Sequence, residues 1–193
     1  MRLIITRHGE TFWNRKHLMQ GTIDSELSPT GLYEAEKLAK RLKNDHFDYI
    51  YSSPLSRAKL TAEEVARFHP DVTFEVVEDL IERDFGEFEG KTKKDIGWHT
   101  SPHPEPPEGE LSSDNVSRAG QFMSYLLKIH KKSDVVLLVA HKHINSAIIA
   151  SCLGTDWDSV YDMSEWKNTN VTIIQVDKTG DGEVVLLDDA KHL

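Results

Sequence analysis

The chain has 193 residues, of which 38% are hydrophobic, and this is enough apolar material for one well-buried core. Its net charge of -9 argues against a general nucleic-acid binder, and its single cysteine, Cys152, excludes an internal disulfide or a cysteine-built metal site. The longest apolar run, residues 135–140, is too short to cross a membrane, and no signal-peptide pattern is present, so we expect one cytoplasmic domain over residues 1–193.

Strands and helices alternate in the first half of the sequence. Residues 3–6 predict a buried strand, and from Pro29 apolar side chains recur at helical spacing, Leu32 among them. A second strand is expected over residues 48–53, a helix after Pro54, and a third strand over residues 73–77. The long stretch that follows lacks periodicity and is expected to be irregular.

The second half continues the alternation and ends in a hairpin. An amphipathic helix is expected around residues 119–130, then a strand over residues 135–140, then a helix that Gly154 caps. Residues 171–176 and 184–187 predict two antiparallel strands. The pattern predicts an α/β fold, a three-layer α/β/α sandwich whose mostly parallel sheet carries an antiparallel hairpin at its C-terminal edge.

Polar side chains follow three of the predicted strands. Arg7, His8 and Gly9 follow the first, Arg57 follows the second, and a run of His141, Lys142 and His143 follows the strand over residues 135–140. Ligands of such sheets bind outside the carboxyl ends of the strands. We therefore expect these side chains to meet at one edge.

The residue types at this edge fit an anionic ligand, most simply a phosphoryl group. Arginine presents a rigid fork of donors that matches phosphate oxygens. A histidine flanked by fixed positive charge is kept neutral near pH 7, and neutral imidazole is a nucleophile. Gly9 has no side chain, so we expect it to let the backbone approach the phosphate closely.

The run Thr6-Arg7-His8-Gly9-Glu10-Thr11 resembles the signature of the histidine phosphatase superfamily, also called the phosphoglycerate mutase-like family. Further matches follow in the order of that family: Asn14, Gln20-Gly21, Asp24, Leu27-Ser28, Gly31, Ser52-Ser53, Arg57, residues 82–86, Glu89-Gly90, Pro107, Gly109-Glu110 and His141.

The resemblance implies a role for each matching residue around the phosphate. His8 would be the nucleophile that becomes a phosphohistidine, and Arg7, Arg57 and His141 would surround the transferring group and balance its charge. Further hydrogen bonds to phosphate or substrate would come from three other matching positions, Asn14, Gln20 and Gly21.

Glu82 is the residue that the resemblance implies as general acid and then general base. A carboxyl group must be protonated for the first task, so we expect partial burial to raise its pKa. Several acidic residues crowd this segment, and Asp84 is the competing candidate.

One position departs from the pattern of the family, which usually has glycine after its second histidine. Lys142 stands there, and it either adds positive charge near the substrate or points to solvent. His143 is a possible substitute for His141, because a shift of two residues keeps a side chain on the same face of a strand. These histidines could also bind a metal with His8, but no Asp-rich or Cys motif accompanies them, so we expect no metal.

The irregular residues 97–113 are long for a loop in an α/β domain, and such loops are often functional. We expect a lid over the phosphate site, with Glu110 and Arg118 as possible contacts to the far end of the substrate.

The resemblance therefore implies a phosphomonoesterase of the histidine acid phosphatase type that acts on a small phosphorylated metabolite without metal or cofactor, as a monomer or homodimer. The alternative within the family is a cofactor-dependent phosphoglycerate mutase, which must keep water from the phosphoenzyme. The short stretch between Glu82 and Arg118 favours the phosphatase, because mutases of the family have extra segments there. A non-catalytic binder of phosphorylated ligands is a third hypothesis. The sequence does not identify the substrate.

Overall fold

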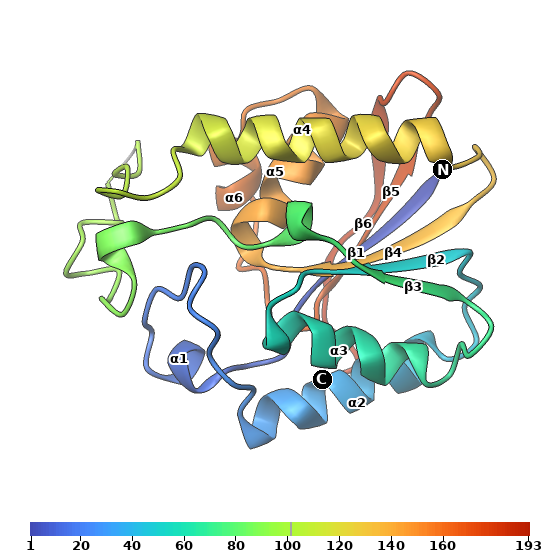
Figure 1. Cartoon of the computed structure of the whole chain (residues 1–193), viewed down its shortest axis with the longest axis horizontal. Helices are drawn as coiled ribbons and strands as arrows, with labels where there is room; N and C mark the ends of the chain where they lie inside the picture. Colours follow the sequence, from blue (N-terminus) through green and yellow to red (C-terminus); the bar gives the residue numbers. More distant parts are fainter. Residues whose placement is uncertain (101) are drawn as a thin grey trace.

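A six-stranded sheet forms the centre of the molecule in the computed structural model, which describes residues 1–100 and 102–193. The strand order is β3-β2-β4-β1-β5-β6 (Figure 1). The first four of these are mutually parallel, whereas β5 is antiparallel to β1 and β6 to β5. The strands are β1 (Arg2–Arg7), β2 (Tyr49–Ser52), β3 (Thr73–Val76), β4 (Val135–Ala140), β5 (Val171–Val176) and β6 (Gly182–Asp189).

Helices cover both faces of the sheet, which confirms the predicted three-layer architecture and its antiparallel C-terminal hairpin. In Figure 1, α2 (Pro29–Leu42) and α3 (Ser56–Ala66) lie below the sheet, and α4 (Ser112–Ile129) and α5 (Lys142–Leu153) lie above it. Short helices that the sequence did not predict are α1 (Phe12–Arg15) and α6 (Trp157–Asp162), with 3-10 turns η1 (Glu78–Leu80) and η2 (Gly86–Phe88).

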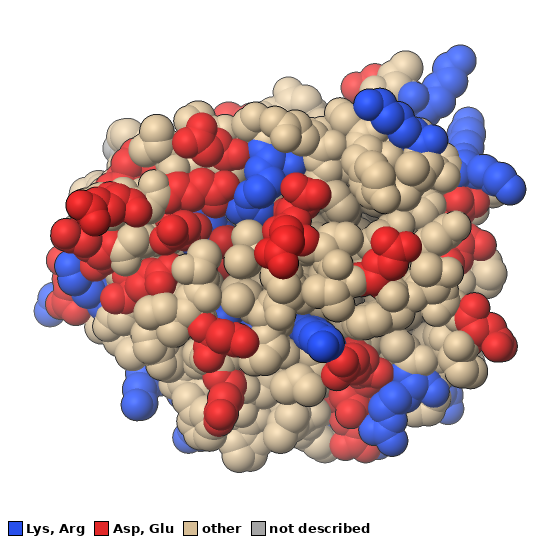
Figure 2. All heavy atoms as spheres, in the orientation of Figure 1, with Lys and Arg blue, Asp and Glu red and all other residues tan. Residues whose placement is uncertain are grey.

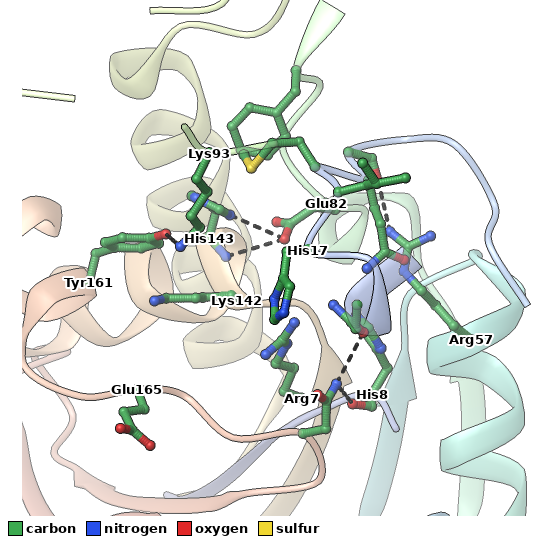
Figure 3. Close-up of a pocket in the computed structure, with 17 residues that line it drawn as sticks. Arg7, His8, His17, Arg57, Glu82, Lys93, Lys142, His143, Tyr161 and Glu165 are labelled. Carbon is green, nitrogen blue, oxygen red and sulfur yellow. Dashed lines mark hydrogen bonds and ion pairs between the residues drawn. The ribbon is translucent and has the colours of Figure 1, made fainter. Parts of the chain in front are cut away.

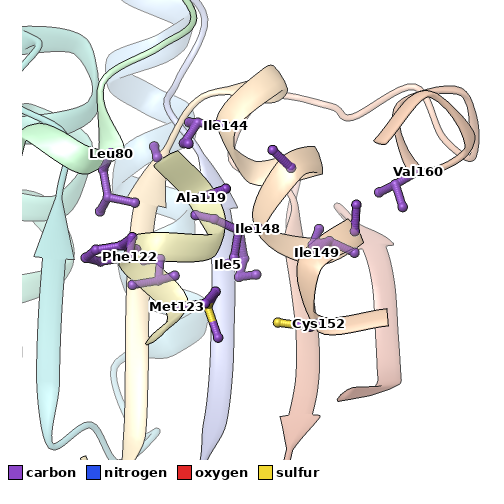
Figure 4. Packing of buried hydrophobic residues seen from close by; sticks show 14 of the residues in the cluster. Ile5, Leu80, Ala119, Phe122, Met123, Ile144, Ile148, Ile149, Cys152 and Val160 are labelled. Carbon is purple, nitrogen blue, oxygen red and sulfur yellow. The ribbon is translucent and has the colours of Figure 1, made fainter. Parts of the chain in front are cut away.

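Side chains of β1 alternate between two hydrophobic cores. Leu3 and Ile5 pack into the core under α4 and α5, which Figure 4 shows, and Ile4 packs into the core over α2 and α3. All three are almost completely buried. Burial of one such side chain contributes about 1.5–3 kcal/mol, so the register that places Arg7 and His8 at the end of β1 is firmly set.

The ends of two helices show how local sequence defines the elements. Ser28 caps α2, because its hydroxyl accepts a hydrogen bond from the amide of Gly31 and Pro29 takes the first helical position. Gly154 ends α5 in the left-handed conformation, at φ 62°, as the sequence predicted. Leu32 was expected on the buried face of α2 but is exposed, because the buried face passes through Gly31 in that turn.

Four segments meet at one edge of the sheet. The parallel strands β1, β2 and β4 end there, and β5 starts there because it runs in the opposite direction. The loop before β5 therefore reaches the same place as the loops after the other strands. No helix of the described residues has the length and apolar character needed to cross a membrane.

Candidate active site

A pocket of about 320 Å³ opens at this edge of the sheet (Figure 3). Its basic floor contrasts with the outer surface, where Figure 2 shows acidic side chains prominent on one face, in keeping with the net charge of -9. The polar residues that line the pocket are Arg7, His8, Asn14, His17, Gln20, Gly21, Arg57, Glu82, Lys93, Lys142, His143, Tyr161, Glu165 and Asn168.

His8 is buried at the base of the pocket and is fixed in one tautomer. Its Nδ1 lies 2.7 Å from the carbonyl oxygen of Gly9. Because a carbonyl only accepts, Nδ1 carries the hydrogen and the lone pair is on Nε2. Burial, together with the charges of Arg57 and His141, holds the pKa of His8 well below its usual value. The imidazole is therefore neutral and nucleophilic at Nε2, as the sequence led us to expect.

Arg57 is buried and held by three hydrogen bonds. Its two terminal nitrogens donate to the carbonyls of Ile23 and Gly21, both at 2.7 Å, and its Nε donates to Nδ1 of His141 at 3.3 Å. Burial lowers its pKa to about 10, so the guanidinium remains charged at neutral pH. A fixed cation next to His8 is suited to bind a phosphoryl oxygen.

Arg7 reaches the pocket from the end of β1. One terminal nitrogen donates to the carbonyl of Trp166 at 2.8 Å, and its buried Nε has no partner among the described residues. An unpaired buried donor is costly unless a ligand accepts from it. Asn168, from the same loop as Trp166, donates to the carbonyl of His8 at 2.8 Å and so fixes the backbone of this candidate nucleophile.

His141 lies beside His8 but does not line the pocket. The two rings are 5.1 Å apart, and His141 is completely buried. Because Nδ1 accepts from Arg57, the hydrogen is on Nε2, which donates to the Ser53 hydroxyl at 2.8 Å. In this state His141 orients Arg57 and lies beside the ring of His8.

Glu82 lines the pocket, whereas the competing Asp84 accepts from the amide of Gly86 and does not line it. Burial would raise the pKa of Glu82, but the His143 imidazole and the Arg83 amide outweigh that effect and hold the pKa well below its usual value. The expectation of a raised pKa is therefore wrong for this state. Sequence alone did not reveal that the start of α5 supplies donors to this carboxylate.

His143 binds Glu82 and is not equivalent to His141. Its Nδ1 lies 3.3 Å from the Glu82 carboxylate, so Nδ1 carries the hydrogen and donates. Burial lowers the pKa of His143 to about 4, despite the opposing charge of Glu82, and this keeps the imidazole neutral near pH 7. The structure thus places one histidine against the candidate nucleophile and the other against the candidate acid.

Glycine is required at position 9 for a different reason from the one expected. It does not line the pocket, and a Cβ built on it would lie 2.4 Å from the carbonyl oxygen of Gly31 in α2. Its missing side chain therefore permits close packing of the loop after β1 against α2. Its amide donates to the Thr61 hydroxyl of α3 at 3.1 Å.

The other three residues implied as substrate contacts do line the pocket. Gly21 has φ 55°, and the turn at this position presents its carbonyl to Arg57. Gln20 accepts from the Thr11 hydroxyl through its amide oxygen, which leaves its NH2 group available to a ligand. Asn14 is held by the Thr11 amide in a capping box at the start of α1.

Sequence reasoning missed several lining residues, notably Lys93, Tyr161 and Asn168. Asn168 could have been found from the sequence, because it precedes a strand expected to be antiparallel. Such a strand starts at the edge where the parallel strands end. Lys93 and Tyr161 follow no strand of the sheet, so the rule that ligands bind after the parallel strands could not find them. His17, which follows α1, is an exposed residue that also lines the pocket.

Residues 97–113 do not cover this pocket, insofar as they are described; Ser101 lies outside the described residues. Trp98 is buried against Phe85, and Arg83 pairs with Glu105. The described residues of this segment therefore do not form the expected lid, and Trp98 packs against His143 beside the site instead.

Arg118 and Glu110 pair with each other at 2.8 Å and do not line the pocket. Arg118 instead donates to the carbonyls of Asp79 and Ile81, and so holds the segment that leads to Glu82. Among the described residues, no group of three His, Cys, Asp or Glu side chains is placed to hold a metal ion.

Comparison with known proteins identifies the family. The sequence model of the histidine phosphatase superfamily (branch 1) matches residues 3–189, and the chain belongs to that superfamily. It is 33% identical to phosphoserine phosphatase 1 of Hydrogenobacter thermophilus, over 81% of this chain and 78% of that protein. It is 30% identical to a 2,3-bisphosphoglycerate-dependent phosphoglycerate mutase of Methylobacterium sp. (strain 4-46), over 97% and 98% respectively.

A solved structure agrees with this assignment. A mutant of the phosphoserine phosphatase of Entamoeba histolytica, in complex with phosphoserine, superposes with a TM-score of 0.85 at 28% identity, over 100% of this chain and 98% of that one. The mutase matches over nearly its whole length, so similarity of sequence alone does not separate the two activities.

Proposed function

We propose that this protein is a phosphohydrolase that acts on a small phosphorylated metabolite through a phosphohistidine on His8. The observation that carries the proposal is the fixed tautomer of His8, which leaves the lone pair on Nε2 in a pocket that also contains Arg7 and Arg57. Relatives named as phosphoserine phosphatases support hydrolysis of a phosphomonoester. Because these residues supply both a nucleophile and charge stabilisation, we propose that no metal or cofactor takes part. We also propose that the enzyme acts in the cytoplasm.

The first step transfers the phosphoryl group to the protein. The Nε2 lone pair of His8 forms a bond to phosphorus while the bond from phosphorus to the leaving oxygen breaks. Arg7 and Arg57 stabilise the charge on the phosphoryl oxygens. Glu82 gives a proton to the leaving alkoxide, so that an alcohol departs.

The proton for this step must come with the substrate, because the pKa of Glu82 is held well below its usual value and the carboxyl is ionised in the protein without ligand. A phosphomonoester has a second pKa of about 6, so its monoanion can bring one proton into the site. In the second step, ionised Glu82 accepts a proton from water as the oxygen of water attacks phosphorus. The P–N bond then breaks, and phosphate and neutral His8 are released.

Access of water favours hydrolysis over the mutase reaction. A mutase must hold the phosphoenzyme away from water until a second hydroxyl arrives. Here His17 and Glu165 are exposed side chains that line the pocket, so its mouth is open to solvent.

The proposal is tested with a 32P-labelled phosphomonoester and a rapid quench. We expect an acid-labile, base-stable adduct on the wild-type protein and none on His8→Ala. Equal labelling of His8→Ala would refute the assignment of the nucleophile. The same preparations are assayed with 3-phosphoglycerate: isomerisation faster than phosphate release would establish the mutase alternative, and loss of hydrolysis after chelation would establish a metal-dependent reaction.

A further inference from the structure

We infer that Lys142, together with Lys93 and Tyr161, forms a second anion-binding subsite in this pocket, which selects phosphomonoesters that carry a carboxylate on the leaving group. The inference rests on the proposed function, and it assigns a role to a position where the resemblance led us to expect glycine.

The three side chains converge on one wall of the pocket from separate elements (Figure 3). Lys142 is the first residue of α5, Tyr161 belongs to α6, and Lys93 follows η2 in the chain. The Lys142 ammonium lies 3.7 Å from the centre of the Tyr161 ring, and the Lys93 ammonium donates to the Tyr161 hydroxyl at 3.1 Å. One aromatic ring therefore holds two cations close together.

These three side chains offer donors to a ligand and no free acceptor. The Tyr161 hydroxyl oxygen also accepts from Nε1 of Trp98 at 3.2 Å, so both of its lone pairs are engaged and its hydrogen remains to be donated. A Lys ammonium can only donate. A ligand that binds all three groups must accept hydrogen bonds, and a carboxylate does so with two oxygens.

Neither lysine has an acidic partner among the described residues. Among the described residues, the lysines that form ion pairs are Lys40, Lys59 and Lys191, all on the surface and outside the pocket. Lys142 is half-buried in the pocket, where an ammonium without a counter-ion is unfavourable. An anion from the substrate would remove this cost.

The electrostatics of Lys142 agree with a missing anion. Burial lowers its pKa to about 7, the charges of Lys93 and Arg7 contribute to the shift, and Asp162 and Asp188 oppose it. A lysine near this pKa gains a full charge when a carboxylate binds beside it.

The subsite is distinct from the residues that bind the phosphoryl group. Arg7 and Arg57 already supply two positive charges in the pocket with His8, which match the two negative charges of the phosphoryl group once its proton has passed to Glu82. A pocket of about 320 Å³ has the size for a small metabolite that spans both groups. The leaving group, not the phosphate, is therefore the part that Lys142 recognises.

The test compares two substrates that differ only at the recognised group. In 3-phosphoglycerate a carboxylate stands where glycerol 3-phosphate has a hydroxymethyl group. The variants are Lys142→Met, which keeps most of the length of the side chain and its packing on Tyr161, and Lys142→Arg, which keeps the charge. Lys178→Met is the matched control, because Lys178 is an exposed lysine in the turn after β5, at the opposite edge of the sheet. Values of kcat/KM are measured for both substrates at pH 6.5.

We expect kcat/KM of the wild-type protein to be at least about tenfold higher for 3-phosphoglycerate, and Lys142→Met to lose about 10- to 100-fold more on that substrate than on glycerol 3-phosphate. Lys142→Arg should keep most of the preference, and Lys178→Met all of it. Equal use of the two substrates by wild type, or an equal loss on both in Lys142→Met, would overturn the subsite.

A binding measurement separates this inference from the proposed function. Calorimetric titration of both ligands into His8→Ala, with and without Lys142→Met, reports the carboxylate preference without turnover. A preference in binding that disappears with Lys142→Met supports the subsite even if the wild type hydrolyses neither compound. Hydrolysis through His8 combined with no preference in binding would refute the subsite alone.

Discussion

Replacing Glu82 by glutamine removes the carboxylate that would accept a proton and pass it on, but keeps the shape of the side chain. One carboxylate oxygen accepts from the amides of Arg83 and Ile144 at 3.0 and 3.3 Å, and the other from the amide and Nδ1 of His143 at 3.4 and 3.3 Å. The single side-chain oxygen of glutamine can replace only one of these two carboxylate oxygens. We expect it to take the shorter pair, so that the two donors of His143 lose their acceptor.

The cost to folding is moderate. Two long buried hydrogen bonds at about 1 kcal/mol each give a loss of about 2 kcal/mol in the free energy of unfolding. The free energy of unfolding of a natural protein is about 5–15 kcal/mol, so the variant should remain folded. Thermal denaturation followed by circular dichroism checks this before any kinetic comparison.

The effect on catalysis should depend on the leaving group. An alkoxide needs a proton to depart, so kcat/KM of Glu82→Gln for an alkyl phosphate should fall by about 10²- to 10⁴-fold. Nitrophenolate departs without one, so kcat/KM for p-nitrophenyl phosphate should fall by less than about tenfold. The matched control is Asp84→Asn, a neighbouring carboxylate that does not line the pocket and should leave both values near wild type. Equal losses of Glu82→Gln on both substrates would refute Glu82 as the acid.

Three further outcomes follow from the structure. First, because Glu82 is ionised without ligand, kcat/KM for an alkyl phosphate should decline as pH rises above about 6, where the monoanion of the substrate disappears; a profile that is flat from pH 5 to 8 would contradict the proton route. Second, the preference of the wild type for 3-phosphoglycerate over glycerol 3-phosphate should decrease as pH rises through about 7, because the Lys142 ammonium loses its proton, and Lys142→Arg should show no such decrease. Third, Gly9→Ala should unfold at a markedly lower temperature than wild type, because its Cβ would lie 2.4 Å from the Gly31 carbonyl oxygen, whereas unchanged stability would mean that α2 shifts without cost.

The part of the pocket that contains Arg7, His8 and Arg57 could be predicted, because ligands of such sheets bind outside the carboxyl ends of the parallel strands. Buried strands are visible as short apolar runs, and Arg7, His8 and Arg57 follow them directly. The family pattern then selected Glu82 from a crowded acidic segment, and the structure places it in the pocket.

The leaving-group end could not be predicted in the same way. Tyr161 is on α6, a short helix with no strong sequence signal, and its position depends on packing against α5. Lys93 lies in an irregular segment whose path is set by tertiary contacts. The pKa of Glu82 was predicted with the wrong sign, because burial was visible in the sequence but the hydrogen-bond donors of α5 were not.

The direction of β5 also determines when the site can exist during synthesis. His8 leaves the ribosome early, yet Arg7 and His8 are held by the loop of residues 166–170, whose Trp166 amide binds Asp188 at the end of β6. A nascent chain that lacks β5 and β6 has His8 but not the loop contacts that hold it. The complete pocket therefore forms only after residues 166–189 have been synthesised.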